Sequence, residues 1–165
     1  MTGTRIAASE ALDSTVSKEW IRGIDKSLLT SPVYHAHRNR YGVKCGGSLG
    51  MWESSGWISA LDPYGAFQWY CRFFQGRRTT DDDRQIARFL GVMGDKGRFR
   101  TQLMNKCLAS GKRHDDTSVS PVIRQSLQHW GYELTPEDFA KGAKRIRGGK
   151  GAAAPRVEQK NRKFS

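Results

Sequence analysis

Apolar residues recur every three or four positions in several stretches of the chain, which is the spacing of an amphipathic helix. The best marked of these helices begins at "DPYG", where Asp62 can cap the first turn and Pro63 suits the first helical position. Gly76 is placed to end it, because glycine readily takes the left-handed conformation that follows a helix. The sequence therefore predicts a helix over residues 63–76.

Further helices are predicted on both sides of this one. Upstream, a set of apolar residues after Ser17 falls on one helical face: Trp20, Ile21, Ile24 and Leu28. Downstream, Thr80 can cap a helix whose apolar stripe consists of Ile86, Phe89, Leu90 and Met93.

The next helix is expected roughly over residues 96–110, ended by Gly111, and its inward residues are Phe99, Leu103, Cys107 and Leu108. Ser120 and Thr135, each followed by proline, mark two more helix starts. The first of these ends at Gly131, with Ile123, Leu127 and Trp130 facing inward.

Residues 31–58 break this pattern, because they are rich in glycine and polar side chains, and they predict loops or a short hairpin. The expected fold class is mainly α: a compact bundle of about five to six helices, an irregular Gly-rich segment and a disordered basic C-terminal tail. The expected divisions are a flexible N-terminus at 1–15, a single α-helical domain at 16–147 and the tail at 148–165.

The stretch "FQWYCRFFQGRR" holds five aromatic residues and three arginines. Apart from Gln68, Arg72 and Gln75, its helical part is apolar nearly all round, and such a helix normally lies at the centre of a molecule. Arg77 and Arg78 follow the glycine that ends the helix. They can either pair with the aspartates one turn further on or clamp a phosphate.

Ile86, Ala87, Leu90, Gly91 and Val92 follow the order found in the first helix and turn of helix-turn-helix units. The helix after them carries basic and amide side chains that can contact phosphates and base edges, so it resembles a recognition helix. Its inward residues come about two positions late for this motif. An ordinary core hairpin with a basic outer face would show the same pattern, and both interpretations stay open.

A wider resemblance covers residues 57–135, about half of the chain. The blocks "DPYGAFQWYCRFFQGRRTTDDDRQIARFLGVMGDKGRFR" and "SVSPVIRQSLQHWGYELT" are similar to those of a family of uncharacterised proteins. In that family a DPYG-aromatic-QWYCR-aromatic core precedes GRR and an acidic–Arg–Gln–Ile helix. The resemblance implies a shared compact α-helical unit and no particular activity. Ala66 stands where the family pattern has an aromatic residue, which is expected to loosen the packing there.

The net charge of +12 is unevenly distributed. Residues 1–138 hold 19 basic and 15 acidic residues, whereas residues 139–165 hold 9 basic and 1 acidic residue. The C-terminal segment therefore supplies most of the excess, and such a segment suits polyanions. Three widely separated cysteines indicate reduced thiols, and no apolar run is long enough to cross a bilayer. The expected location is intracellular, in the nucleus or the cytoplasm, without a membrane partner.

Signals for catalysis are weak. Asp81, Asp82 and Asp83 can be considered as metal ligands of a nuclease, but consecutive positions on a helix point apart, and acids favour a helix start in any case. His35 and His37 lack the further ligands that would complete a zinc site. No catalytic residue, metal site or cofactor is assigned.

The sequence favours a non-catalytic nucleic-acid-binding protein that contacts DNA or RNA with a basic helical face and a basic tail, in a manner similar to a helix-turn-helix. The alternatives are a protein-interaction module using Trp52, Trp57 or Tyr64, and a metal-dependent nuclease. The expected nucleic-acid-binding residues are Arg77, Arg78, Lys96, Arg98, Arg100, Thr101, Gln102, Asn105, Lys106, Lys144, Arg145 and Arg147.

Overall fold

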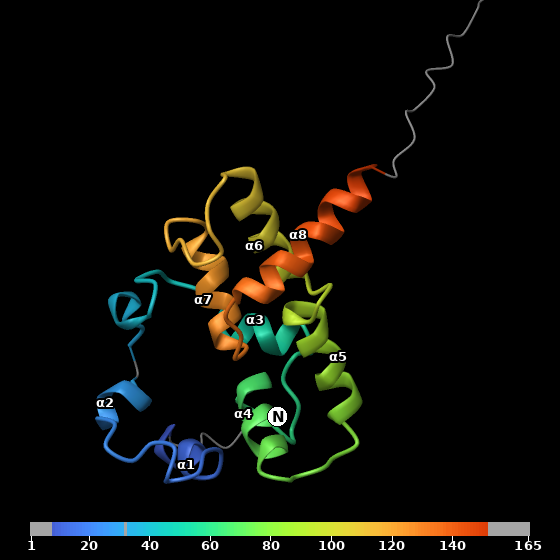
Figure 1. Ribbon diagram of the computed structural model, residues 1–165. Helices are drawn as coiled ribbons and strands as arrows, with labels where there is room; N and C mark the ends of the chain where they lie inside the picture. Colours follow the sequence, from blue (N-terminus) through green and yellow to red (C-terminus); the bar gives the residue numbers. More distant parts are fainter. Residues whose placement is uncertain (1–7, 32, 152–165) are drawn as a thin grey trace, which may run out of the picture.

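The computed structural model describes residues 8–31 and 33–151, and over these ranges the chain forms helices and no strand (Figure 1). This confirms the mainly α fold class. Along the chain the elements are α1 (Ala8–Asp13), α2 (Lys26–Leu29), a 3-10 helix (Ala36–Arg38), α3 (Leu49–Ser54), α4 (Ala66–Phe74), α5 (Asp82–Met93), α6 (Arg98–Ala109), α7 (Pro121–His129) and α8 (Pro136–Gly151). None of the helices in these ranges is long and apolar enough to span a membrane.

The core of the molecule lies around α6. This helix packs against α5, α7 and α8, and its buried residues Leu103, Met104 and Cys107 form one cluster with Leu127 and Leu134. α6 takes the central place because three neighbouring helices each turn an apolar side towards it. The prediction of a central helix at residues 63–76 is therefore wrong, since α4 makes extensive contact only with α5 among the described helices.

α4 buries one face and exposes the other. Trp69 and Cys71 are buried, and the Trp69 ring packs against Phe89 of α5 with 5.3 Å between ring centroids. On the opposite side, Phe67 and Phe74 are 58% and 67% exposed. The expectation that α4 is covered all round thus fails at these rings, because only one helix packs closely against it.

The helix predicted after Ser17 forms only in its last part. Residues 18–23 are turns, and helical structure is confined to α2. Gly23 has a φ of +79°, a conformation that cannot continue a right-handed helix. Several apolar side chains of the predicted helix are exposed as a result: Trp20, Ile24 and Leu28.

The predicted glycine stops are confirmed. Gly76 has a φ of +98°, and its amide donates to the carbonyl of Phe73 over 3.0 Å, which satisfies one of the free carbonyls at the end of α4. Gly111 and Gly131 end α6 and α7 with the same kind of bond. Local backbone chemistry is sufficient to set these three helix ends.

The predicted helix caps are confirmed at one position only. Thr135 accepts the amide hydrogen of Asp138 over 3.1 Å at the start of α8. Asp62, Thr80 and Ser120 do not cap: α4 starts after Gly65, α5 starts after Asp81, and neither these helices nor α7 has a side-chain cap bond. Asp62 is instead fully buried beside arginine side chains.

The three regions expected to lack regular structure differ in outcome. Residues 31–58 are irregular apart from the 3-10 helix and α3, and those that the structure describes form no hairpin. The expected flexible N-terminus contains α1, and its first seven residues, 1–7, lie outside the described residues. The expected disordered tail, 148–165, lies outside them from residue 152 onward, and α8 continues to Gly151.

Candidate nucleic-acid interface

The outer face of α6 presents cationic and amide side chains. Arg98, Gln102, Asn105 and Lys106 are exposed, because the other side of this helix holds the core residues. Positions 98, 102 and 105 follow helical spacing and therefore share one face. Lys96 is exposed in the turn that precedes the helix. The structure thus brings these five members of the predicted set together.

α8 adds further cations next to the start of α6. Lys144, Arg145 and Arg147 are exposed, and Arg145 Nη1 donates to the carbonyl of Asp95 over 2.6 Å. This bond places the C-terminal half of α8 against the turn before α6, so the cations of both helices lie in one region (Figure 1). We call this region the outer cationic face and define it as Lys96, Arg98, Lys106, Lys144, Arg145 and Arg147.

Arg100 and Thr101, also in the predicted set, do not join this face. Arg100 is buried, with Nη2 2.7 Å from Asp138 and 3.0 Å from Asp95. Its guanidinium lies 5.0 Å from the ring centroid of Tyr132, and burial together with a hydrogen bond to Asp138 raises the pKa of Tyr132. The Thr101 hydroxyl is buried as well. Arg100 therefore fixes α6 to α8 and is not exposed to a phosphate.

Arg77 and Arg78 lie in the loop between α4 and α5, at the opposite end of the molecule from α8 (Figure 1). Arg77 Nη2 is 2.5 Å from a carboxylate oxygen of Asp62, so its partner lies upstream and is not one of the three aspartates further along the chain. Arg78 lies over the Phe73 ring at 4.0 Å and donates to the Phe73 carbonyl. The structure does not bring these two arginines together with the outer cationic face.

Two of the three aspartates at the start of α5, Asp81 and Asp82, accept hydrogen bonds from neighbouring donors. Asp81 accepts from Arg84 Nε over 2.5 Å, and Asp82 accepts from the Thr79 amide over 2.9 Å and from Trp69 Nε1 over 2.8 Å. The Arg84 bond lowers the pKa of Asp81, and the Thr79 and Trp69 bonds lower the pKa of Asp82. These carboxylates therefore organise the α4–α5 junction.

His35 and His37 lie edge-on to each other, with 5.6 Å between ring centroids. Within the part of the chain that the structure describes, no group of three or more His, Cys, Asp or Glu side chains is placed to hold a metal ion. The two histidines and the three aspartates are thus not gathered into a common cluster.

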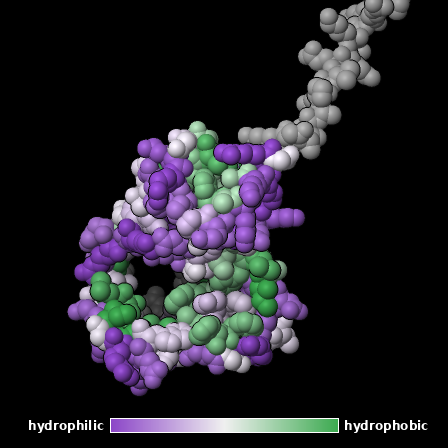
Figure 2. Space-filling view, in the orientation of Figure 1, coloured by the Kyte–Doolittle hydropathy of each residue, from purple (hydrophilic) through white to green (hydrophobic). Residues whose placement is uncertain are grey.

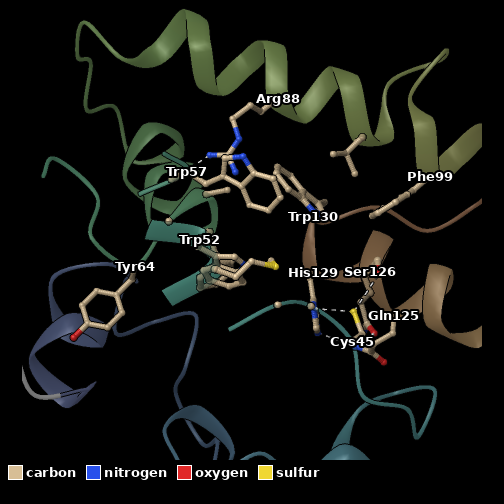
Figure 3. Close-up of a pocket in the computed structure, with 18 of the residues that line it drawn as sticks. Cys45, Trp52, Trp57, Tyr64, Arg88, Phe99, Gln125, Ser126, His129 and Trp130 are labelled. Atoms are coloured by element: carbon tan, nitrogen blue, oxygen red, sulfur yellow. Dashed lines mark hydrogen bonds between the residues drawn. The ribbon is translucent and has the colours of Figure 1, made fainter. Parts of the chain in front are cut away.

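A cavity of about 920 Å³ lies between the 38–47 segment, the α3–α4 region and the helices α5, α6 and α7 (Figure 3). Figure 2 shows a hollow in the surface of the molecule, with apolar residues beside its opening. Its aromatic rings come from helices α3, α4 and α6, from the segment between α3 and α4, and from the residue that directly follows α7. The aromatic lining residues are Trp52, Trp57, Tyr64, Phe67, Phe99 and Trp130.

The charged side chains that line the cavity are all positive. Arg38, Arg40, Arg88 and Arg98 line it, and none of its described lining residues is acidic. Arg40 pairs with Glu133 at 2.8 Å, whereas the other three arginines form no ion pair with any described residue. Five arginines outside the cavity each bind a carboxylate: Arg72, Arg77, Arg84, Arg100 and Arg113.

Arg88 lies between two indole rings in the cavity wall (Figure 3). Its guanidinium carbon is 5.7 Å from the ring centroids of both Trp57 and Trp130, and Nη1 donates to the Trp57 carbonyl and to Gln85 Oε1 over 3.1 Å each. Burial lowers the pKa of Arg88, although a guanidinium keeps its charge at neutral pH. Both hydrogen-bond acceptors are neutral, and Asp81 interacts with the Arg88 charge only at longer range, without forming an ion pair.

A polar cluster occupies another part of the wall (Figure 3). Cys45 Sγ lies 3.1 Å from Ser126 Oγ and 3.6 Å from His129 Nδ1. Gln125 Oε1 accepts from the amide of Tyr41 over 3.1 Å, so its side-chain nitrogen is the atom that faces His129 Nε2, also at 3.1 Å. That nitrogen can only donate, and His129 Nε2 must therefore accept.

This network assigns the proton of the neutral His129 ring to Nδ1, which donates it towards Cys45 Sγ. Ser126 Oγ donates to the Val122 carbonyl over 2.9 Å and is left to accept from the Cys45 thiol. Burial lowers the pKa of His129 and favours the neutral ring. Because Nδ1 then has no free lone pair, it cannot accept the proton of Cys45 in this arrangement.

Sequence reasoning missed the cavity as a site, although it had singled out some of its residues. Trp52, Trp57 and Tyr64, proposed as an apolar contact patch, all line it. Ala66, where the family pattern has an aromatic ring, lines it too. Cys45 and His129 are 84 residues apart, and no local spacing rule connects residues at such a separation.

No family model, curated protein or solved structure matches this chain. The resemblance of residues 57–135 to an uncharacterised family stays an expectation, and a function for this protein has to be inferred from the geometry of the outer cationic face and the cavity.

Proposed function

We propose that this protein binds nucleic acid and does not catalyse a reaction on it. The observation that carries the proposal is the distribution of unpaired cations. They extend from α8 through Lys96 to Arg98, and Arg98 also lines the cavity where two further unpaired arginines lie. A surface that gathers cationic side chains without carboxylate partners attracts a polyanion, because its positive potential offsets the repulsion between neighbouring phosphates.

The physical role of the outer cationic face is to hold phosphates. Each Lys or Arg that neutralises a phosphate releases condensed counterions, so affinity falls as the salt concentration rises. Gln102 and Asn105 lie on the same face of α6 and can donate to phosphate or sugar oxygens. Because α6 is held on its other sides by α5, α7 and α8, its cations project from a rigid support.

The proposal predicts that removing three cations of this face weakens binding in a salt-dependent way. The variant Lys96→Ala/Arg98→Ala/Lys106→Ala is compared with wild type by fluorescence anisotropy, using labelled single-stranded DNA, RNA and duplex DNA over a salt series. Each phosphate contact on a single strand releases about 0.7 counterions. Loss of three contacts should therefore reduce the magnitude of the slope of log affinity against log salt by about 2, and affinity at low salt should drop roughly tenfold or more.

A charge-matched control is available in the N-terminal segment. Lys18→Ala/Arg22→Ala/Lys26→Ala also removes two lysines and one arginine, and these residues lie well away from α6 and α8 (Figure 1). This variant should bind nearly as wild type does. Equal losses in the two variants would mean that net charge alone drives binding, and the assignment of the site to the outer cationic face would be wrong.

A further inference from the structure

The cavity has the size and the surfaces of a ligand site. Its volume of about 920 Å³ falls within the range of roughly 300–1,000 Å³ typical of such sites. Among its aromatic lining residues, Trp57, Tyr64 and Phe67 are 42%, 38% and 58% exposed. Large apolar rings are costly to leave in water, so exposed rings in a concave wall favour a ligand with flat apolar faces.

The charge of the cavity restricts the ligand further. Arg38 donates only to the backbone carbonyl and hydroxyl of Ser27, Arg88 donates only to neutral acceptors, and Arg98 lies over the Phe99 ring at 4.7 Å. None of the three forms an ion pair with a described carboxylate, although Asp25 interacts with Arg38 and Asp81 with Arg88 at longer range. The ligand that complements this cavity is therefore anionic.

Unpaired nucleotides have both the flat apolar faces and the negative charge that the cavity favours. Each carries a planar base that can stack on an aromatic side chain and a phosphate that can pair with arginine. The bases of a duplex are stacked on one another and cannot enter a cavity without being unpaired first. Arg98 belongs both to the outer cationic face and to the cavity wall, so one strand can contact both surfaces.

We propose that the cavity binds unpaired nucleotides of single-stranded nucleic acid, with bases stacked on its aromatic side chains, Trp57 among them, and phosphates paired with Arg38, Arg88 and Arg98. This inference rests on the proposed function and adds the class of nucleic acid. The outer cationic face supplies affinity for any polyanion, and the cavity supplies the preference for single strands.

The first test compares two tryptophans of similar exposure in the full-length protein. Trp57→Ala removes a ring of the cavity, and Trp20→Ala removes a ring that is 44% exposed on the N-terminal segment and does not line the cavity. Fluorescence anisotropy is measured with a short labelled single strand and with its duplex. Trp57→Ala should weaken single-strand binding roughly tenfold, as loss of one stacked base does, and leave duplex binding unchanged. Trp20→Ala should change neither.

Two more variants separate stacking from folding. Trp57→Phe keeps an aromatic ring and should retain most of the single-strand affinity, because stacking requires only the π-face. Ala66→Phe keeps every charge and every ring but fills part of the cavity, so it should weaken single-strand binding without affecting the duplex. Circular dichroism and thermal unfolding identify any variant whose loss of binding comes from loss of the fold.

The outcomes distinguish the two proposals. If wild type binds the single strand and both Trp57→Ala and Ala66→Phe bind it equally well, the cavity does not hold bases, and nucleic-acid binding by the outer cationic face still stands. If wild type binds none of the probes, the proposed function fails and the cavity assignment fails with it. If a labelled mononucleotide binds as tightly as the strand, the cavity is a site for free nucleotides, which overturns the assignment to single strands.

Discussion

Asp62 shows at the scale of one residue how this protein holds a carboxylate in its interior. Its side chain has no exposed surface, and its two oxygens lie 3.1 Å from Arg72 Nη1 and 2.5 Å from Arg77 Nη2. Arg72 also donates to the carbonyl of Ser14, which ties the segment after α1 to α4. The sequence predicted a helix cap at Asp62 because a cap depends on local position, whereas its arginine partners are 10 and 15 residues away.

Replacing Asp62 with alanine should therefore destabilise the protein strongly. The change leaves two arginines without their carboxylate partner, and breaking such a pair typically costs about 3–5 kcal/mol. Because both arginines are partly exposed, we expect the lower end, about 3 kcal/mol, in the free energy of unfolding measured by urea denaturation. Asp83→Ala, at an exposed position in the first turn of α5, is the control and should cost less than about 1 kcal/mol. Similar losses in both variants would show that Asp62 has no special role.

At the scale of the helix, the sequence predicted what is local and misjudged what depends on packing. The spacing of apolar residues identified α5, α6 and α7, and the Thr135–Pro136 start signal identified α8. Glycine stops such as Gly76 were found because they act on the backbone nearby. The apolar spacing after Ser17 was misleading, since Gly23 interrupts the helix. α4 was placed at the centre because composition does not reveal that only one helix packs closely against it.

The contact between α6 and α8 can be tested with a pair of glycines in one helix. A Cβ at Gly142 would lie 2.1 Å from Met104 Sδ, and Met104 is fully buried, so its side chain has little room to move. A Cβ at Gly148 would meet no atom within 4 Å. Gly142→Ala should lower the free energy of unfolding by about 1–2 kcal/mol, because overpacking outweighs the gain in helix propensity.

Gly148→Ala should instead stabilise the protein slightly, by up to about 1 kcal/mol, because it gains helix propensity without a steric conflict. Both values can be read from urea denaturation curves at neutral pH. If Gly142→Ala were as stable as Gly148→Ala, α8 would not pack on α6 as described. The outer cationic face would then lose its structural basis, since it relies on these two helices lying together.

At the scale of the whole molecule, the candidate site joins segments that are distant in the sequence. The cavity is lined by residues from Arg38 to Trp130, and its charge pattern emerges only when these segments come together. All six cations of the outer cationic face were expected from the sequence, because they lie in or directly before helices that local signals predict. It could not predict that Arg100 turns inward, since this depends on Asp138 of another helix.

The proposed place of single-stranded bases in the cavity can be tested by locating their contacts on the protein. The most direct measurement is ultraviolet cross-linking of the full-length protein to a short single strand, with mass spectrometry to identify the attached residues. We expect cross-links at cavity residues, above all Trp57, Trp130 and Phe99. Cross-links confined to the exposed rings of α4 outside the cavity, Tyr70 and Phe74, would show that bases do not lie there.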